Sequence, residues 1–166
     1  MDSRGTNLVA ALGTTLGDAV TVAVTRATGL SGAAPATLTT LLDQPGLSVD
    51  ALARTVGVTG SGGVRLVDRL ADAGLVERRA GRDGRSLAIR LTTAGERAAR
   101  EVLAARQGAV RGLVKCLDRD DQATLVQLAE KLLTAGASQE RAGLLCRLCD
   151  HGACPPRRCP VEQALP

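Results

Sequence analysis

The 166-residue chain contains no phenylalanine, tyrosine or tryptophan. Proteins that bind RNA or single-stranded DNA stack unpaired bases on aromatic side chains, so this class of function is excluded. Any nucleic acid that the chain binds must therefore be a duplex. The chain is also short for a multidomain enzyme or a long repeat array, whereas its 45% of apolar residues suffices for one soluble core.

Two targeting features are also missing from the sequence. Residues 1–4 do not open a basic region followed by an apolar core and a cleavage site, as a secretory signal would. The longest mostly apolar stretch, residues 8–24, is interrupted by polar residues and falls short of a membrane span. We therefore expect a cytoplasmic protein without membrane contact, whose five cysteines do not form a disulfide framework.

Apolar residues at helical spacing, capping residues and glycine or proline breaks predict six helices and one β-hairpin. The helices are expected from about residue 5 to Gly29, from Pro35 to about Leu42, after a cap at Ser48, from a cap at Thr59 to Gly74, from Thr93 to Leu117, and from a cap at Asp118 to Gly136. The strands are expected at residues 75–80 and 87–91, around a glycine-containing turn. The sequence thus predicts a mainly α fold with a small β-hairpin.

The apolar stripes on these helices identify the faces expected to be buried. They are Leu8, Leu12, Leu16, Val20, Ala23 and Ala27 on the first helix, Val64, Val67, Leu70 and Ala71 on the fourth, and Leu125, Leu128, Ala129 and Leu132 on the sixth. Cys116 is interpreted as a small buried hydrophobe on the inner face of the fifth helix.

The positive charge is concentrated in one part of the chain. Residues 54–90 carry eight arginines against four acidic residues, an excess equal to the net charge of +4. Arg65 and Arg69 lie one turn apart opposite the apolar stripe of the fourth helix, and Arg82 and Arg85 lie at the hairpin tip. Any single arginine here is as readily a solvated surface residue, but their joint placement favours contact with duplex phosphates.

Residues 47–59 and 64–79, followed by Asp83-Gly84-Arg85 and by residues 91–95, resemble the MarR family of winged helix-turn-helix transcriptional regulators. The resemblance covers about residues 5–136. It implies a DNA-binding part at about 33–92 and dimerisation helices at about 5–29 and 93–136, followed by a Cys-rich extension at 137–166. By this resemblance the chain is a homodimeric repressor that binds a pseudopalindromic operator in double-stranded DNA.

The resemblance also implies which residues contact DNA. Ser61, Gly62 and Arg65 fall where a recognition helix enters the major groove, whereas Asp83 would orient the wing and Arg85 would enter the minor groove. Together with their neighbours, the expected DNA-binding residues are Thr59, Ser61, Gly62, Arg65, Arg69, Arg79, Arg82, Asp83 and Arg85. Because Gly60, Gly62 and Gly63 supply no side chains for readout, we expect modest base specificity or recognition through close backbone approach and DNA shape.

Family members often bind small aromatic anions, but this chain has no aromatic side chain to stack on such a ligand. The effector, whether a small molecule, a metal or an oxidant, therefore stays open.

Four cysteines form a separate feature beyond the resemblance: Cys146, Cys149, Cys154 and Cys159. Prolines prevent one continuous helix here, and Ser138 is expected to cap a short helix that places the first two cysteines on one face. Four converging thiolates would bind Zn²⁺ or an iron–sulfur cluster.

Three other interpretations of this segment are open. The cysteines are an inert, disordered tail, or they form a thiol–disulfide switch in which Arg147, Arg157 and Arg158 lower the pKa of nearby thiols. His151 would replace one cysteine as a metal ligand, although a single histidine here is more often an exposed loop residue.

Three classes of function remain at this point. The first is the dimeric DNA-binding regulator, with the cysteines sensing a metal or an oxidant. The second is a winged-helix module that docks an acidic protein instead of DNA. The third, a thiol oxidoreductase built on Cys146 and Cys149, is the weakest because the βαβ context of such a site is missing, and we expect no enzyme activity.

Overall fold

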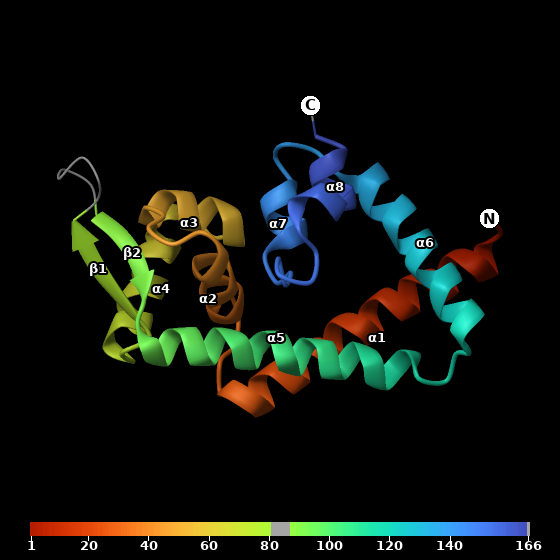
Figure 1. Cartoon of the computed structure of the whole chain (residues 1–166), viewed down its shortest axis with the longest axis horizontal. Helices are drawn as coiled ribbons and strands as arrows, with labels where there is room; N and C mark the ends of the chain where they lie inside the picture. Colours follow the sequence, from red (N-terminus) through yellow and green to blue (C-terminus); the bar gives the residue numbers. More distant parts are fainter. Residues whose placement is uncertain (81–86, 166) are drawn as a thin grey trace.

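The computed structural model describes residues 1–80 and 87–165. In chain order its elements are α1 (Ser3–Thr28), α2 (Ala34–Asp43), α3 (Val49–Val56), α4 (Gly60–Asp72), β1 (Val76–Ala80), β2 (Leu87–Leu91), α5 (Thr93–Val114), α6 (Arg119–Gly136), α7 (Ala142–Cys146), a 3₁₀ turn (Pro156–Arg158) and α8 (Pro160–Gln163). Helices α2 to α4 and the hairpin form a lobe at one end of α5, while α6 begins beyond the other end (Figure 1). This arrangement confirms the mainly α fold with a small β-hairpin.

The helices begin where local capping chemistry places them. The hydroxyl of Ser48 accepts from the Ala51 backbone N–H at the start of α3, and the Asp118 carboxylate accepts from the Asp121 N–H at the start of α6. Helix α5 ends at Val114, not at Leu117 as expected. Cys116 lies past this end and is exposed, so its expected burial is wrong in the single chain.

The hairpin is antiparallel, with Val76 opposite Leu91, and the segment just before α3 adds one further pairing to it. The Ile89 N–H donates to the Leu47 carbonyl, and the Gly46 N–H donates to the Ile89 carbonyl, both at 2.9 Å. Ile89 is fully buried as a result. The predicted turn at 81–86, including Arg82, Asp83 and Arg85, lies outside the described residues.

The core lies inside the lobe and is built from aliphatic side chains and alanine, with three buried threonines of α2, Thr37, Thr39 and Thr40, beside them. Its fully buried members come from α2, α3, α4 and β2: Leu38, Leu41, Leu52, Val67 and Ile89. The expected burial of Val67 and Leu70 on α4 is confirmed, whereas that of Val64 is wrong because this side chain is 46% exposed. Gly63 takes the buried position instead, next to α3.

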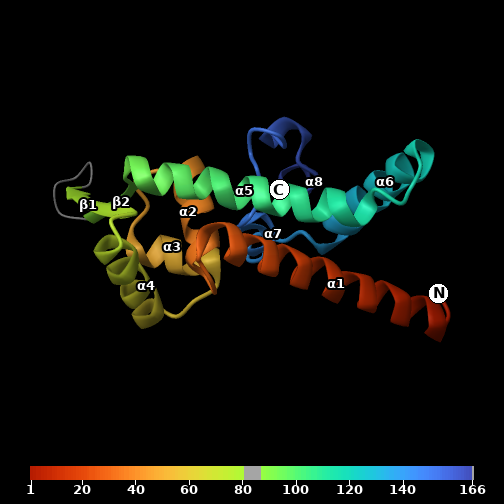
Figure 2. The same ribbon diagram turned by 90° about the horizontal axis from the view of Figure 1, so that it is seen from below.

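The apolar stripes of α1 and α6 are largely uncovered in the single chain. Leu8 is 51% exposed and Leu132 is 68% exposed, while Val24 is the one described residue of α1 that is buried. Helix α1 packs along α5 and then extends past it to the N-terminus (Figure 2). By length and composition alone α1 also qualifies as a membrane span, contrary to the expectation from residues 8–24.

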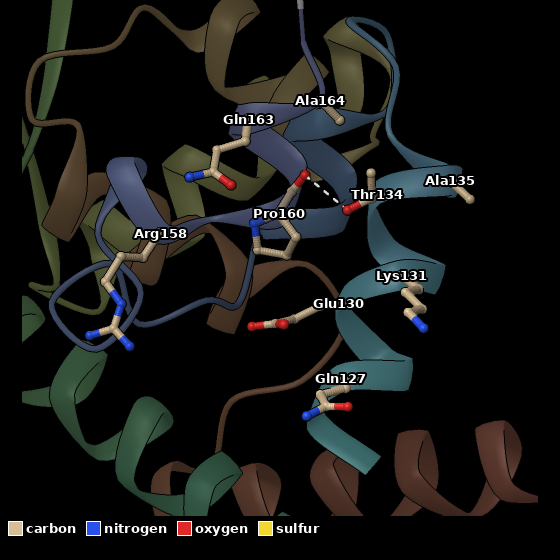
Figure 3. A pocket seen from close by; sticks show the side chains of 9 residues that line it. All are labelled: Gln127, Glu130, Lys131, Thr134, Ala135, Arg158, Pro160, Gln163 and Ala164. Atoms are coloured by element: carbon tan, nitrogen blue, oxygen red, sulfur yellow. Dashed lines mark hydrogen bonds between the residues drawn. The ribbon is translucent and has the colours of Figure 1, made fainter. Parts of the chain in front are cut away.

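The C-terminal segment folds back between the lobe and α6 (Figure 1). Helix α7 begins at Ala142 without a side-chain cap, so the expected cap at Ser138 is wrong. A groove of about 730 Å³ separates α6 from α8 and is lined mainly by polar side chains such as Glu130 and Arg158 (Figure 3). One hydrogen bond crosses it, from the Thr134 hydroxyl to the Pro160 carbonyl at 3.5 Å.

Gly95, in the first turn of α5, is a position where a side chain has no room. A Cβ there would lie 1.9 Å from the Leu75 carbonyl oxygen. The backbone N–H of Thr92 donates to this same carbonyl, and the Thr92 hydroxyl donates to the Gly74 carbonyl. We call these four residues the joint, because they attach the lobe to α5.

We expect Gly95→Ala to lower the free energy of unfolding by about 3 kcal/mol, because α5 must shift to relieve the overlap. Chemical denaturation followed by circular dichroism measures this loss. Thr93→Ala, at an exposed position in the same turn, is the control and should change stability by less than about 0.5 kcal/mol. A Gly95→Ala protein as stable as the wild type would show that the joint tolerates a side chain.

Candidate nucleic-acid interface

The outward face of α4 brings together the DNA-binding residues expected on this helix. Thr59 caps the helix by accepting from the Gly62 N–H at 3.2 Å, and Ser61, Arg65 and Arg69 are exposed. Gly62, Arg65 and Arg69 also line a groove of about 650 Å³ beside the helix. The first half of α4 therefore presents hydroxyl, backbone and guanidinium donors on one side, as a helix that enters a major groove does.

The glycines at the start of α4 differ in whether the structure has room for a side chain at their positions. A Cβ on Gly63 would lie 2.8 Å from the Ala53 Cβ, so this glycine lets α4 pack closely on α3. A Cβ on Gly60 would meet nothing within 4 Å. The exposed end of the helix is thus open to close backbone approach, and its N-terminal dipole favours a phosphate there.

Val64 is a surface residue that the sequence pattern assigned to the core. It is exposed on α4 next to Arg65, and an apolar side chain at such a position is able to contact the methyl group of thymine in a major groove. The helical period alone gave no signal for this, because the buried position beside it is a glycine. The glycine-rich start of the helix was the available hint that close packing had replaced an apolar side chain.

The arginines of β1 are engaged with acidic side chains. The Arg79 guanidinium binds the Glu77 carboxylate through two hydrogen bonds, of 2.7 and 3.0 Å, and this lowers the pKa of Glu77. Arg79, expected to contact DNA, is thus paired with Glu77 in the unbound chain, by an exposed ion pair of the kind that a phosphate can replace. Arg78 binds Asp68 of α4 and so joins the hairpin to the helix. Sequence reasoning missed this positioning contact, since nothing local relates residues ten positions apart.

The structure gathers the four tail cysteines at the end of α7 and the start of α8, and all four are free thiols. Cys149 and Cys159 are near enough to raise the pKa of Cys146, and Cys159 is near enough to raise the pKa of Cys154. Cys159 is buried, at 8% exposure. In residues 1–80 and 87–165, however, no three His, Cys, Asp or Glu side chains are arranged to hold a metal ion as they stand.

The pKa values of Cys146 and Cys154 are raised, whereas we expected nearby arginines to lower the pKa of the tail thiols. Burial, and then the neighbouring Cys149 and Cys159, raise the pKa of Cys146 to about 12. The pKa of Cys154 is raised for the same kinds of reason, and the opposing effect of Arg158 is the smallest. This environment disfavours a reactive thiolate switch.

His151 is half-buried, and its Nδ1 lies 3.2 Å from the Asp43 carboxylate of α2. The expectation of an exposed loop histidine is therefore wrong, because the tail packs His151 against the lobe. This contact also places His151 among the residues that attach the tail.

In metal-free, reduced protein at about pH 8, we expect iodoacetamide to alkylate Cys116 before Cys146. Alkylation requires the thiolate, and a raised pKa keeps the Cys146 thiol protonated until the pH approaches about 12, whereas Cys116 is exposed. Mass spectrometry of peptides from a time course measures both rates, and the Cys146 rate should rise with pH. Faster reaction at Cys146 at neutral pH would contradict the assigned environment.

Comparison with known proteins supports this description of the lobe. A model of the MarR family matches residues 28–86. The MarR family protein Rv2887 of Mycobacterium tuberculosis, in complex with salicylic acid, is 32% identical, with 75% of this chain and 93% of that chain covered and a TM-score of 0.60. The complex of Rv2887 with DNA gives 27% identity, coverage of 79% and 98%, and a TM-score of 0.66.

A further solved structure shares the fold. Wild-type MarR of E. coli in its apo form is 23% identical, with 76% of this chain and 95% of that chain covered and a TM-score of 0.65. Comparison with curated proteins gives no match. On the identity and coverage with Rv2887, and on the winged helix-turn-helix lobe described above, the chain belongs to the MarR family of transcriptional regulators.

Proposed function

We propose that the chain is a cytoplasmic, homodimeric transcriptional repressor, without enzyme activity, that binds a pseudopalindromic operator in double-stranded DNA. The observation that carries the proposal is the exposed first half of α4. Ser61, Val64 and Arg65 are exposed there, while the opposite face of the helix packs into the aliphatic core. The Rv2887 complex with DNA supports the same use of the lobe.

In this proposal the side chains of α4 have different roles in DNA recognition. Arg65 reads a base edge in the major groove, because a guanidinium donates two hydrogen bonds to guanine. Arg69, one turn further along, binds the phosphate backbone and fixes the position of the helix. Asp68 is held by Arg78, which keeps its negative charge compensated near the DNA. With few side chains for readout, shape and backbone contacts supply the rest of the specificity.

The exposed apolar residues of α1 and α6 support the homodimer. They include Leu8, Val9, Leu12, Val126, Leu128, Leu132 and Leu133. Exposed apolar residues in this number on two helices mark an interface, and a two-fold interface covers the same surface on both chains. Two lobes related by a two-fold axis then match the two halves of a pseudopalindrome.

The effector of this chain differs in our proposal from the salicylic acid bound by Rv2887. A cavity between α1 and α2 has a volume of about 60 Å³, and Leu148 of the tail lines it together with residues of both helices. Drug-sized ligands occupy pockets of roughly 300 Å³ or more. The space between α1 and α2 is therefore too small for such a ligand, and we propose that the chain senses its effector through the Cys-rich tail, which packs on both the lobe and α5.

We expect Arg65→Ala to weaken binding to a selected operator duplex by about 1–3 kcal/mol and to relax the preference at one base pair. Fluorescence anisotropy on the operator and its single-base variants measures both effects. Arg119→Ala is the control, because it removes the same positive charge from an exposed position at the start of α6. This variant should bind as the wild type does.

Two results would contradict this part of the proposal. An equal loss on every duplex would make Arg65 a phosphate contact. Failure of the wild-type protein to bind any duplex, with salt-sensitive binding to an acidic protein, would replace the DNA-binding function by protein docking.

We expect the wild-type protein to be a dimer and Leu132→Glu to shift it toward monomer, because a carboxylate would be buried in the apolar interface of α6. Size-exclusion chromatography with light scattering measures the mass over a concentration series. Leu87→Glu, at an exposed leucine of β2 outside α1 and α6, should leave the dimer intact. A monomeric wild-type protein would contradict the assigned interface.

A further inference from the structure

The four tail cysteines come from three short pieces of chain that the fold brings to one place. Cys146 ends α7, and Cys159 stands immediately before α8. Helices α7 and α8 pack against each other, and Cys149 and Cys159 are close enough to Cys146, as Cys159 is to Cys154, to raise the pKa of these thiols. Four uncrosslinked thiols in one part of the fold have the donor chemistry that a soft metal ion prefers, although no three of them surround a common point in the described part of the chain.

The loop between the second and third cysteines is held by one carboxylate. Asp150 accepts from the backbone N–H groups of Gly152 and Ala153 through one oxygen, at 3.0 and 3.2 Å. Its other oxygen accepts from the Gln107 side chain of α5 at 2.8 Å. The Cys149 N–H also donates to the Cys146 carbonyl at 2.8 Å. The backbone between the cysteines is thus ordered by bonds that do not involve sulfur.

We propose that Cys146, Cys149, Cys154 and Cys159 together bind one thiophilic divalent metal ion, such as zinc, in a tetrahedral thiolate site. A single ion holds its four sulfur atoms about 3.8 Å apart, given metal–sulfur bonds of about 2.3 Å. The mutual influence of the thiols on their pKa values places them near one another, as a single ion requires, whereas an iron–sulfur cluster separates its ligand sulfurs more widely. Binding requires the four sulfur atoms to turn toward a common point and to lose their protons.

The site is connected to the DNA-binding lobe and to α5 by polar contacts of the tail. The buried hydroxyl of Thr39, in the middle of α2, donates to the Arg147 carbonyl at 2.7 Å. His151 faces Asp43 on the same helix, and Asp150 holds Gln107 on α5. A metal ion that rigidifies the tail therefore affects both the lobe and α5, which are attached to each other at the joint. This regulatory role rests on the proposed function, whereas the metal site rests on the tail alone.

The test uses the full chain, purified without oxygen, stripped with a chelator and titrated with Co²⁺ and then Zn²⁺. We expect one Co²⁺ per chain, with the absorption of tetrahedral thiolate coordination, and full displacement by Zn²⁺. Cys149→Ser and Cys154→Ser should each abolish stoichiometric binding. Cys116→Ser removes the one cysteine outside the tail and should bind as the wild type does. Circular dichroism confirms that each variant is folded.

Three outcomes would overturn the metal assignment. They are a reduced wild-type protein that does not bind Co²⁺, a Cys116→Ser variant that fails as Cys149→Ser does, and iron with acid-labile sulfide in the purified protein.

The regulatory role has its own measurement. Metal-loaded and metal-free wild type should differ about fivefold or more in operator affinity, and Cys149→Ser should show no such response. Equal affinities would overturn the coupling. If the protein binds metal but no duplex, only the proposed function is contradicted. If it binds a duplex but no metal, only the metal site inferred here is contradicted.

Discussion

Helix α5 can pack against the start of β1 only because residue 95 has no Cβ. The Leu75 carbonyl occupies the space that a side chain would need, and Thr92 donates hydrogen bonds to the consecutive carbonyls of Gly74 and Leu75. This joint sets the direction in which the lobe leaves α5. In a homodimer built on α1 and α6, that direction decides how far apart the two α4 helices lie, and hence which spacing of half-sites the protein accepts.

The absence of aromatic side chains has a consequence inside the lobe. Without large rings, the core is filled by aliphatic residues, and its helices approach closely where small residues meet. Gly63 against Ala53 is the clearest case, since it brings α4 onto α3 at the turn between them. The other glycines of this start leave α4 with few long side chains at the end that we propose faces DNA. Gly63 thus explains the close packing on one face of the helix, whereas Gly60, in open space, only reduces the side chains on the other.

The features that were predictable from the sequence are those with local causes. Caps at Ser48, Thr59 and Asp118 need only the residues that follow them, and all three helices begin there. Turns at glycine and the strands of the hairpin are local in the same sense. Val64 was misplaced because a periodic pattern counts apolar side chains, whereas the packing selected the neighbouring glycine.

Features that depend on distant contacts could not be predicted. The stripes of α1 and α6 were correctly recognised as apolar, but their expected burial is not found, because most of these side chains are exposed in the single chain. The candidate residues of α4 do share one surface, whereas Arg79 is bound to Glu77, a pairing that alternation along a strand could have indicated. The spacing of the tail cysteines showed which thiols matter. It did not show that the tail would pack against α2 and α3.

Energetics indicate what the lobe and the proposed metal ion would each contribute to ordering the tail. Within its described part only Cys159 and Val161 are buried, far too little apolar surface to order about 30 residues alone. Docking through Thr39 and Asp150 supplies part of the ordering free energy, and four metal–thiolate bonds would supply the rest. Because binding free energies are linked reciprocally, a lobe position that favours docking also favours the metal. A position of the lobe selected by DNA would then change metal affinity by the same factor by which the metal changes DNA affinity.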